Sequence, residues 1–399
     1  MEGFRRWCRR TLVCGLTEQE RKAIAVDREI ELSLRLDWGR MQQIFLYGPS
    51  LSGKTTFLKQ MRIIHGEGYS EEQRLAFAKL IFQNIFTAIK ALANAMTALN
   101  IPYTHPENQM YAQWIQDVET LQVTKLEPRH TEAIRRLWAD PGLRTCYSRR
   151  REYQLLDSTE YYMSNLDRIA APDFIPNNQD VLRVQVPTEH VSEWCFTVGQ
   201  YSIGMVDTQY MGRQFWRWIC DITSIIYVVS IGEYDQQLDG WMEYRNRMEE
   251  YRDGFHRLVN CRYLRCFPFV LFLNKMDILA DKIQTSDLQT YYPEFTGKKG
   301  DAEAAMNFIR TLFLPLPETW ERGERGPVYG HFTCAIDAHN IRQVFDDVKN
   351  TVSDRLPAAA QARLTSDPPT PQPNPPHPAP TSIPIPLLTT AGTRFGPPY

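Results

Sequence analysis

The stretch YGPSLSGKTTFLKQM, residues 47–61, separates Gly48 by four residues from the run Gly53, Lys54 and Thr55. A short apolar segment, MQQIFLY, precedes it, and a helix-like segment follows it. In a strand, loop and helix of this kind, backbone N–H groups and the helix N-terminus point at one anion. The lysine reaches the β and γ oxygens of a nucleotide. The spacing therefore predicts a phosphate-binding loop in which Thr55 offers its hydroxyl to Mg²⁺.

Composition limits the class of protein. The chain has 399 residues, of which 43% are hydrophobic, and a net charge of -2. This is enough for two domains with real cores, and the charge gives no general reason to expect nucleic-acid binding. The 8 cysteines form no CxxC pair, which argues against a zinc cage or disulfide framework and favours a reducing cytosol. The apolar stretches ITSIIYVVSIG and FPFVLFLN are too short to cross a bilayer, so we expect no transmembrane segment.

The order of the patterns predicts an α/β fold. Residues 69–170 have helical periodicity throughout. After them, the strand-like segments SIGMVD, ITSIIYVVS, PFVLFLNK and YGHFTCA alternate with helix-like segments around NRMEEYRDGFHRLV, GDAEAAMNFIRTLF and NIRQVFDDVKNTVSDRL. This alternation predicts a doubly wound, mostly parallel sheet that is interrupted by an all-helical insert.

The two ends of the chain have their own character. Residues 1–15 are rich in arginine, and a capping box at residues 17–20 opens a polar helix that runs to about Leu36. Pro357 ends the last helix, and a proline-rich tail follows. We expect this tail to be disordered or polyproline II, either as a solvated segment or, through its PxxP spacings, as an SH3-type ligand.

Two short segments indicate which base the nucleotide carries. NKMD, residues 274–277, closes an apolar strand, and Asp277 there accepts two hydrogen bonds from guanine that adenine does not offer. TCA, residues 333–335, ends the next strand and supplies a backbone N–H to the guanine O6. This pattern predicts a guanine nucleotide. A P-loop kinase is disfavoured because no second substrate site is visible.

The segments KQMRIIHG, RRREYQLLDSTEYY, QDVLR, NKMD and HFTCAIDAHNIRQVF together match one family. Through them the chain resembles an alpha subunit of the heterotrimeric G proteins over residues 16–356. Pro187 and the RRREYQLLDSTEYY segment favour the Gq class, and LTEQER resembles its alpha-fifteen/sixteen branch. The resemblance implies a Ras-like P-loop GTPase domain with an inserted all-helical domain. Its parts are an N-terminal segment and helix (1–37), the Ras-like domain (38–68 and 183–356), the helical domain (69–182) and the tail (357–399).

The resemblance also implies roles for single residues. The pair at residues 157–158 closes over the nucleotide, and the backbone at residues 182–183, in the segment called switch I, contacts it. Thr188 completes the Mg²⁺ shell with Thr55, and Asp207 holds a metal-bound water. The predicted nucleotide-binding residues are Gly48, Ser50, Leu51, Ser52, Gly53, Lys54, Thr55, Thr56, Asp157, Ser158, Leu182, Arg183, Asp207, Asn274, Lys275, Asp277, Thr333, Cys334 and Ala335.

Several residues around the γ-phosphate depart from the family pattern. Gln185 stands where the family has its arginine finger, and a neutral amide does not supply that charge. Met211 replaces the glutamine that orients the attacking water, and Tyr210 replaces a glycine whose N–H approaches the γ-phosphate. Ser50 and Leu51 replace Gly-Glu in the phosphate loop. These changes predict a site that binds GTP and GDP but hydrolyses GTP weakly. The alternative is neutral drift or an error in the gene model.

Membrane attachment and partners are implied as well. Cys8 and Cys14 in the arginine-rich segment predict S-palmitoylation, with free thiols as the alternative, and Glu2 excludes N-myristoylation. We therefore expect a peripheral location on the cytoplasmic face of the plasma membrane, with a cytosolic pool.

The implied partners are a beta-gamma dimer on the N-terminal helix, a G-protein-coupled receptor and an effector of the phospholipase C type. Here the proline-rich tail replaces the residues that enter the receptor in the family. The rival to a cycling switch is a pseudo-GTPase interaction module that holds beta-gamma or an effector.

Overall fold

The computed structural model describes residues 41–186, 192–198, 201–207, 222–236, 246–261, 263–265, 267–314 and 326–353. The predicted N-terminal helix and the proline-rich tail lie outside these ranges. The same holds for Cys8, Cys14, Thr188, Tyr210 and Met211.

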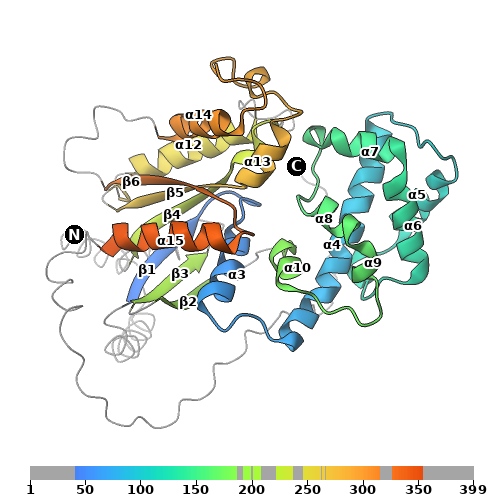
Figure 1. Ribbon diagram of the computed structural model, residues 1–399, viewed down its shortest axis with the longest axis horizontal. Coiled ribbons are helices and arrows are strands. Elements are labelled where there is room, and N and C mark those ends of the chain that lie inside the picture. The colour runs from blue at the N-terminus through green and yellow to red at the C-terminus, as the bar shows by residue number, and fades with distance from the viewer. Residues whose placement is uncertain are drawn as a thin grey trace, which may run out of the picture. The chain divides into compact units, whose positions relative to one another are not determined.

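The centre of the fold is a six-stranded sheet with the order β2-β3-β1-β4-β5-β6 (Figure 1). Adjacent strands of the sheet are parallel, except for β2 and β3, which are antiparallel. The predicted mostly parallel, doubly wound sheet is therefore confirmed. The strands are β1 (Met41–Tyr47), β2 (Ser192–Val198), β3 (Tyr201–Asp207), β4 (Ile222–Ser230), β5 (Phe269–Asn274) and β6 (Val328–Thr333).

The edge strand β2 was not predicted. Its apolar residues Trp194, Phe196 and Val198 alternate with Cys195 and Thr197 instead of forming a continuous run. Phe196 and Val198 are buried, and Trp194 packs against the same core. This period of two is typical of a strand that has one face on the core. Antiparallel edge strands show this alternation, whereas buried parallel strands form continuous apolar runs.

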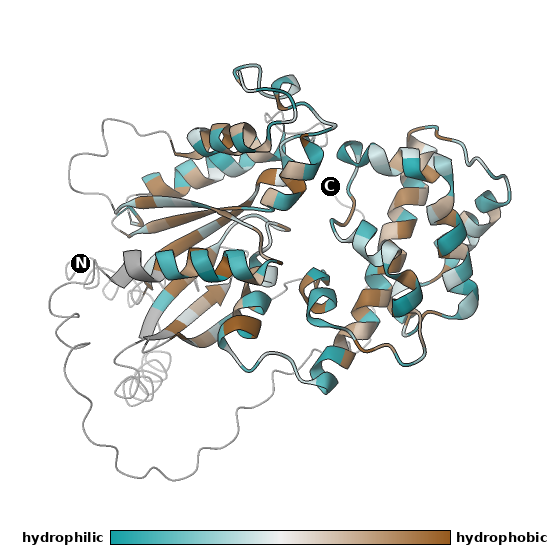
Figure 2. Ribbon diagram, in the orientation of Figure 1, coloured by the Kyte–Doolittle hydropathy of each residue, from teal (hydrophilic) through white to brown (hydrophobic). Residues whose placement is uncertain are grey.

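Alternate side chains along the central strands fill two different cores. On β4, Ile225 and Tyr227 belong to the core beneath α12, α13 and α14, whereas Ile226 and Val228 belong to the core beneath α3 and α15. Both faces of the sheet are therefore covered, and its strands are mostly hydrophobic along their length (Figure 2). These helices are α3 (Lys54–His65), α12 (Arg247–Asn260), α13 (Met276–Lys282), α14 (Ala302–Phe313) and α15 (Ala338–Ser353).

The insert between α3 and β2 consists of helices in the part of it that the structure describes. They are α4 (Glu71–Ala98), α5 (Asn108–Asp117), α6 (Pro128–Ala139), α7 (Pro141–Ser148), α8 (Thr159–Ser164), α9 (Leu166–Ile169) and α10 (Asn178–Arg183). Short 3₁₀ turns η1 (Thr120–Gln122), η2 (Arg150–Glu152), η3 (Ile231–Glu233) and η4 (Leu288–Thr290) complete the described elements. The insert has a hydrophobic core of its own, so the predicted all-helical domain is confirmed.

The long helix α4 is the centre of that core. Ser70 and Gln73 form a capping box at its start, and Ile85, Phe86 and Ile89 are fully buried. Among the described helices, α4 is long and apolar enough to cross a bilayer by length and composition, and half of its most apolar stretch is buried inside the protein. Because those apolar residues pack against α5, α6 and α7, the core of the insert accounts for the composition.

Candidate nucleotide-binding site

The loop between β1 and α3 lies where ligands bind in doubly wound sheets. β1 lies between β3 and β4 in the sheet. After β1 the chain first forms β2 and β3 on one side of it, and then β4, β5 and β6 on the other side. Ligands occupy the crevice beyond the carboxyl ends of the strands at such a switch point. Gly48 begins the loop, and a Cβ there would lie 2.2 Å from the carbonyl oxygen of Val228 on β4. Only glycine lets the loop pass this close to the neighbouring strand.

Asn274 ties the loop to two other segments of the site. Its Nδ2 donates to Ser52 O at 2.8 Å, and its Oδ1 accepts from Thr333 Oγ1 and from the Ala335 N–H, each at 3.1 Å. Gly53 adopts φ 101°, and a Cβ there would lie 2.2 Å from Asn274 Nδ2. The buried amide therefore joins the phosphate loop, NKMD and TCA into one unit.

We expect Asn274→Ala to lower the free energy of unfolding by about 2–4 kcal/mol, because three hydrogen bonds are lost and their buried partners stay unsatisfied. Urea unfolding of the nucleotide-free full chain measures this. Asn307→Ala, at an exposed position on α14, is the matched control and should change stability by less than about 0.5 kcal/mol. Equal losses in the two variants would contradict the role of Asn274.

Lys54 and Leu51 shape the loop itself. Lys54 is buried, and its Nζ donates to Gly48 O and Pro49 O, each at 2.8 Å. Leu51 has φ 64°, and its side chain is 44% exposed. A left-handed conformation costs a residue with a Cβ about 1–2 kcal/mol. Leu51 therefore combines a strained backbone with an exposed apolar side chain at the edge of the cavity described below.

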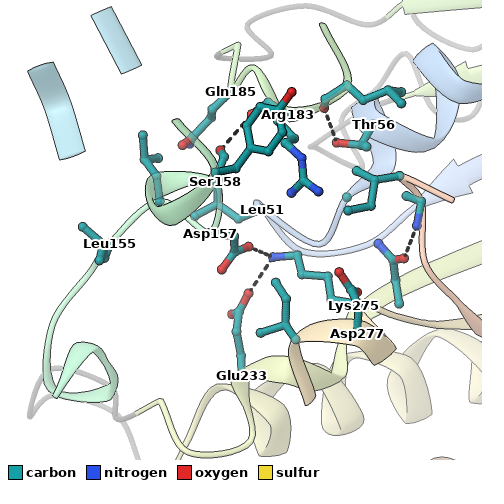
Figure 3. A pocket seen from close by; sticks show the side chains of 18 of the residues that line it. Leu51, Thr56, Leu155, Asp157, Ser158, Arg183, Gln185, Glu233, Lys275 and Asp277 are labelled. Carbon is teal, nitrogen blue, oxygen red and sulfur yellow. Dashed lines mark hydrogen bonds and ion pairs between the residues drawn. The ribbon is translucent and has the colours of Figure 1, made fainter. Parts of the chain in front are cut away.

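Lys275 connects the sheet to the helical insert. Its Nζ lies 2.7 Å from Asp157 Oδ2, which comes from the insert, and 3.2 Å from Glu233 Oε1 in η3, which follows β4 (Figure 3). Burial acts to lower the pKa of Lys275, but these two carboxylates outweigh it and raise the pKa. Asp277 interacts with Cys334, and burial together with this carboxylate raises the pKa of the Cys334 thiol to about 12. NKMD and TCA are thus in contact.

Lys59 fixes the end of α10 against α3. Its Nζ donates to Val181 O at 2.9 Å and to Val184 O at 2.8 Å. Thr56, also on α3, donates to Leu182 O at 3.4 Å. Burial lowers the pKa of Lys59 to about 7. Lys59 was not predicted from the sequence, where its place in KQMRIIHG reads as an ordinary polar position of a helix.

Two residues of the insert hold the switch I backbone from the other side. Ser158 Oγ donates to Arg183 O at 2.9 Å. The Gln185 N–H donates to Asn84 Oδ1 at 2.8 Å, and Asn84 Nδ2 donates to Gln185 O at 3.2 Å. Asn84 was not predicted either, although a buried amide on the apolar face of α4 is a detectable signal. The backbone of Gln185 therefore has a fixed position.

These segments enclose a cavity of 690 Å³, within the usual range for small-molecule sites, about 300–1,000 Å³. The predicted residues that line it are Ser50, Leu51, Gly53, Lys54, Thr55, Thr56, Asp157, Ser158, Leu182, Arg183, Gln185, Asn274, Lys275, Asp277 and Ala335. Lining residues that were not predicted include Tyr147, Arg150, Tyr161, Glu233 and Gln236.

The other predicted residues lie outside this lining. Gly48, Ser52, Thr333 and Cys334 are not part of it. Asp207 ends β3 and pairs in register with Leu46 of β1. Thr188 and Met211 belong to the part of the chain that the structure does not describe.

A phosphate loop at the switch point, joined through Asn274 to a guanine-type NKMD segment and faced by a helical insert, defines a P-loop GTPase fold with an inserted helical domain. The sequence model of the G-protein alpha subunit family matches residues 20–352, so the chain belongs to this family.

Two relatives match the chain over most of its length. The chain is 42% identical over 364 residues to guanine nucleotide-binding protein subunit alpha-15 of Homo sapiens, which covers 88% of this chain and 95% of the relative. It is 41% identical to the protein of that name from Rattus norvegicus, with the same coverage. These relatives confirm the predicted Gq-class alpha subunit that resembles the alpha-fifteen/sixteen branch.

Proposed function

We propose that this G-protein alpha subunit binds GTP and GDP in the 690 Å³ cavity and hydrolyses GTP slowly. One observation supports slow hydrolysis. Gln185 lines the cavity at the position of the family's arginine finger, and Asn84 bonds both its backbone N–H and its carbonyl oxygen. A neutral amide held there does not stabilise the charge that develops on the transferring phosphoryl group. An arginine at such a position contributes about 10³–10⁵ to the rate, or about 4–7 kcal/mol.

The residues around the phosphate loop fit Mg²⁺. This ion prefers oxygen ligands, keeps several waters, and is commonly bound by one or two side chains together with nucleotide phosphates. Thr55 lines the cavity at the start of α3, and Asp207 ends the strand beside β1. Thr55 would hold the ion directly and Asp207 through a water, with Thr188 as a further proposed ligand. Bound there, Mg²⁺ would offset the charge of the β and γ phosphates.

Family membership implies beta-gamma, receptor and effector partners, and peripheral attachment to a membrane. For this chain we propose palmitoylation at Cys8 and Cys14, attachment to the cytoplasmic face of the plasma membrane, and an effector of the phospholipase C type. The proline-rich tail in place of the family's receptor-contacting residues argues against ordinary receptor coupling. The second candidate is a pseudo-GTPase module that binds beta-gamma or an effector without cycling. Tyr210 and Met211, which replace the glycine and the glutamine of the family pattern, favour this second candidate.

The nucleotide content of the purified full chain separates the two candidates. We expect liquid chromatography of the denatured protein to release close to one guanine nucleotide per chain, because the phosphate-loop and base-recognition residues line one cavity. GTP in this pool indicates blocked hydrolysis, and GDP alone indicates turnover or a GDP-locked state. Protein that contains no guanine nucleotide and takes up none from added GDP would overturn nucleotide binding and favour the interaction module.

A further inference from the structure

His130 lies at the start of α6, within the insert, and is only 7% exposed. The ring of Trp114, on α5, stacks on it with 5.3 Å between the ring centres. The ring of Phe86, on α4, meets it almost perpendicularly at 5.2 Å. α5 packs against both α4 and α6 (Figure 1). A polar ring that is buried in this way needs a hydrogen-bond partner within the protein.

The ring nitrogen Nδ1 of His130 takes the place of a helix-capping side chain. The Glu127 N–H donates to Nδ1 at 3.3 Å, as it would to the glutamate or glutamine of an ordinary capping box. Since a backbone N–H only donates, Nδ1 carries no proton in this arrangement. The amide oxygen of a glutamine accepts a hydrogen bond at any ordinary pH. An imidazole that gains a proton becomes a donor at both nitrogens and no longer accepts.

Two charged side chains at the start of α6 act on the ring. Glu127 favours the cationic form of His130, and Arg129 opposes it. Arg129 Nε lies 2.8 Å from Glu127 Oε2, so this carboxylate already has a cationic partner. Burial lowers the pKa of His130, and the attraction of Glu127 does not outweigh it.

The neighbouring helices bring aromatic rings to the two faces of His130. Lys90 lies one turn after Phe86 on α4, and its Nζ donates to Gln116 O on α5 at 2.9 Å. Asp117, at the end of α5, is exposed to solvent. The surface that covers the two faces of the imidazole is therefore mostly apolar, which disfavours a charge on the ring.

The Glu127 bond joins α6 to the segment that precedes it. Residues 118–126 are fastened to α4 through Gln83, whose Nε2 donates to Leu121 O at 2.8 Å. The chain enters α6 at Glu127, and Pro128, which has no N–H, follows at once. Loss of the Glu127 bond therefore loosens the first turn of the helix together with the segment before it.

We propose that His130 is a proton-sensitive cap: when Nδ1 takes up a proton, the Glu127 N–H loses its acceptor and the start of α6 loosens. The pKa of His130 in the folded chain is below the ordinary imidazole value of about 6.5, so the opened chain binds the proton first as the pH falls. The stability that this bond contributes is therefore present above about pH 6.5 and is lost progressively below it. The inference concerns the insert and does not rest on the proposed function, since no nucleotide takes part.

Hydrogen exchange of the full chain at pH 7.5 and 5.5, followed by mass spectrometry and corrected for the intrinsic exchange rate at each pH, tests this cap. The protection of residues 118–135 should fall about 3- to 10-fold at the lower pH, which is the worth of one hydrogen bond. In His130→Gln it should change by less than about twofold, because glutamine accepts the same bond and does not titrate. His339→Gln, at an exposed position on α15, is the matched control and should keep the pH response of the parent chain.

Two further measurements separate the bond from packing. His130→Phe keeps an aromatic ring but has no acceptor, so the protection should be low at both pH values. An NMR titration of the parent chain, which needs no variant to fold, should give one shared midpoint for the His130 ring and the Glu127 amide. A parent-like pH response in His130→Gln, parent-like protection of His130→Phe at pH 7.5, or different midpoints for ring and amide would overturn the proposal.

Discussion

Gln185→Arg is expected to raise the single-turnover rate constant of GTP hydrolysis by about 10²-fold, less than the full worth of an arginine finger because Met211 and Tyr210 still depart from the family pattern. Asn84 holds both the N–H and the carbonyl of residue 185, so the new side chain starts from a fixed backbone on the cavity wall. The positive charge meets a charge that grows only in the transition state, so it acts on the rate more than on the affinity.

Rapid-quench sampling of GTP-loaded protein measures this rate constant. Gln185→Ala is the matched control, and its rate should equal that of the parent chain because the neutral amide contributes no charge. The dissociation constant for GTPγS should change by less than about tenfold in Gln185→Arg. A rate unchanged by the arginine would place the main loss of activity in the segment that contains Tyr210 and Met211.

Asp277→Asn is expected to weaken GDP binding by about 10²- to 10⁴-fold, since a carboxylate that accepts two hydrogen bonds from guanine is replaced by an amide that accepts from only one. Asp277 lines the cavity on the first turn of α13, two residues after the lysine that bridges to the insert. The amide donor of asparagine suits the carbonyl that xanthine carries in place of the guanine amine. Xanthosine diphosphate should therefore bind the variant more tightly than GDP does.

Competition against a fluorescent GDP analogue measures both affinities. Asp281→Asn, a cavity-lining aspartate farther along the same helix, is the matched control and should change GDP affinity by less than about threefold. If Asp277→Asn keeps the affinity and the base preference of the parent chain, the NKMD segment does not recognise the base, and the prediction is wrong.

The buried strands were predictable because they are buried on both faces. The run ITSIIYVVS matches β4, Ile222–Ser230, residue for residue, and β5 forms the same kind of continuous apolar run. A strand covered by helices on both sides needs apolar residues at every position, so its limits are visible in the sequence. β2 has one core-facing side only, and its weaker alternation went unpredicted.

The contacts that hold the site together were not visible in the sequence. Lys59 looks like a polar residue on a helix surface, and Asn84, although it lies on the apolar face of α4, gives no sign in the sequence of the group that it bonds. The burial of both is stable only because they bond backbone groups more than a hundred residues away. Tyr161 is part of the DSTEYY motif, yet the sequence does not show that its hydroxyl bonds Asp180 and that its ring contacts Arg183, both from another helix. Sequence pattern predicted most of the segments that line the cavity. It did not predict the residues that hold these segments in place.

The central claim is that this alpha subunit holds GTP without hydrolysing it at the rate ordinary for the family. Its most direct test is a single-turnover hydrolysis assay on the GTP-loaded full chain, run beside the human alpha-15 relative under identical conditions. Our account predicts that the chain retains bound GTP long after the relative has converted its GTP to GDP, with a rate constant at least about 10²-fold lower. A rate constant equal to that of the relative would contradict it.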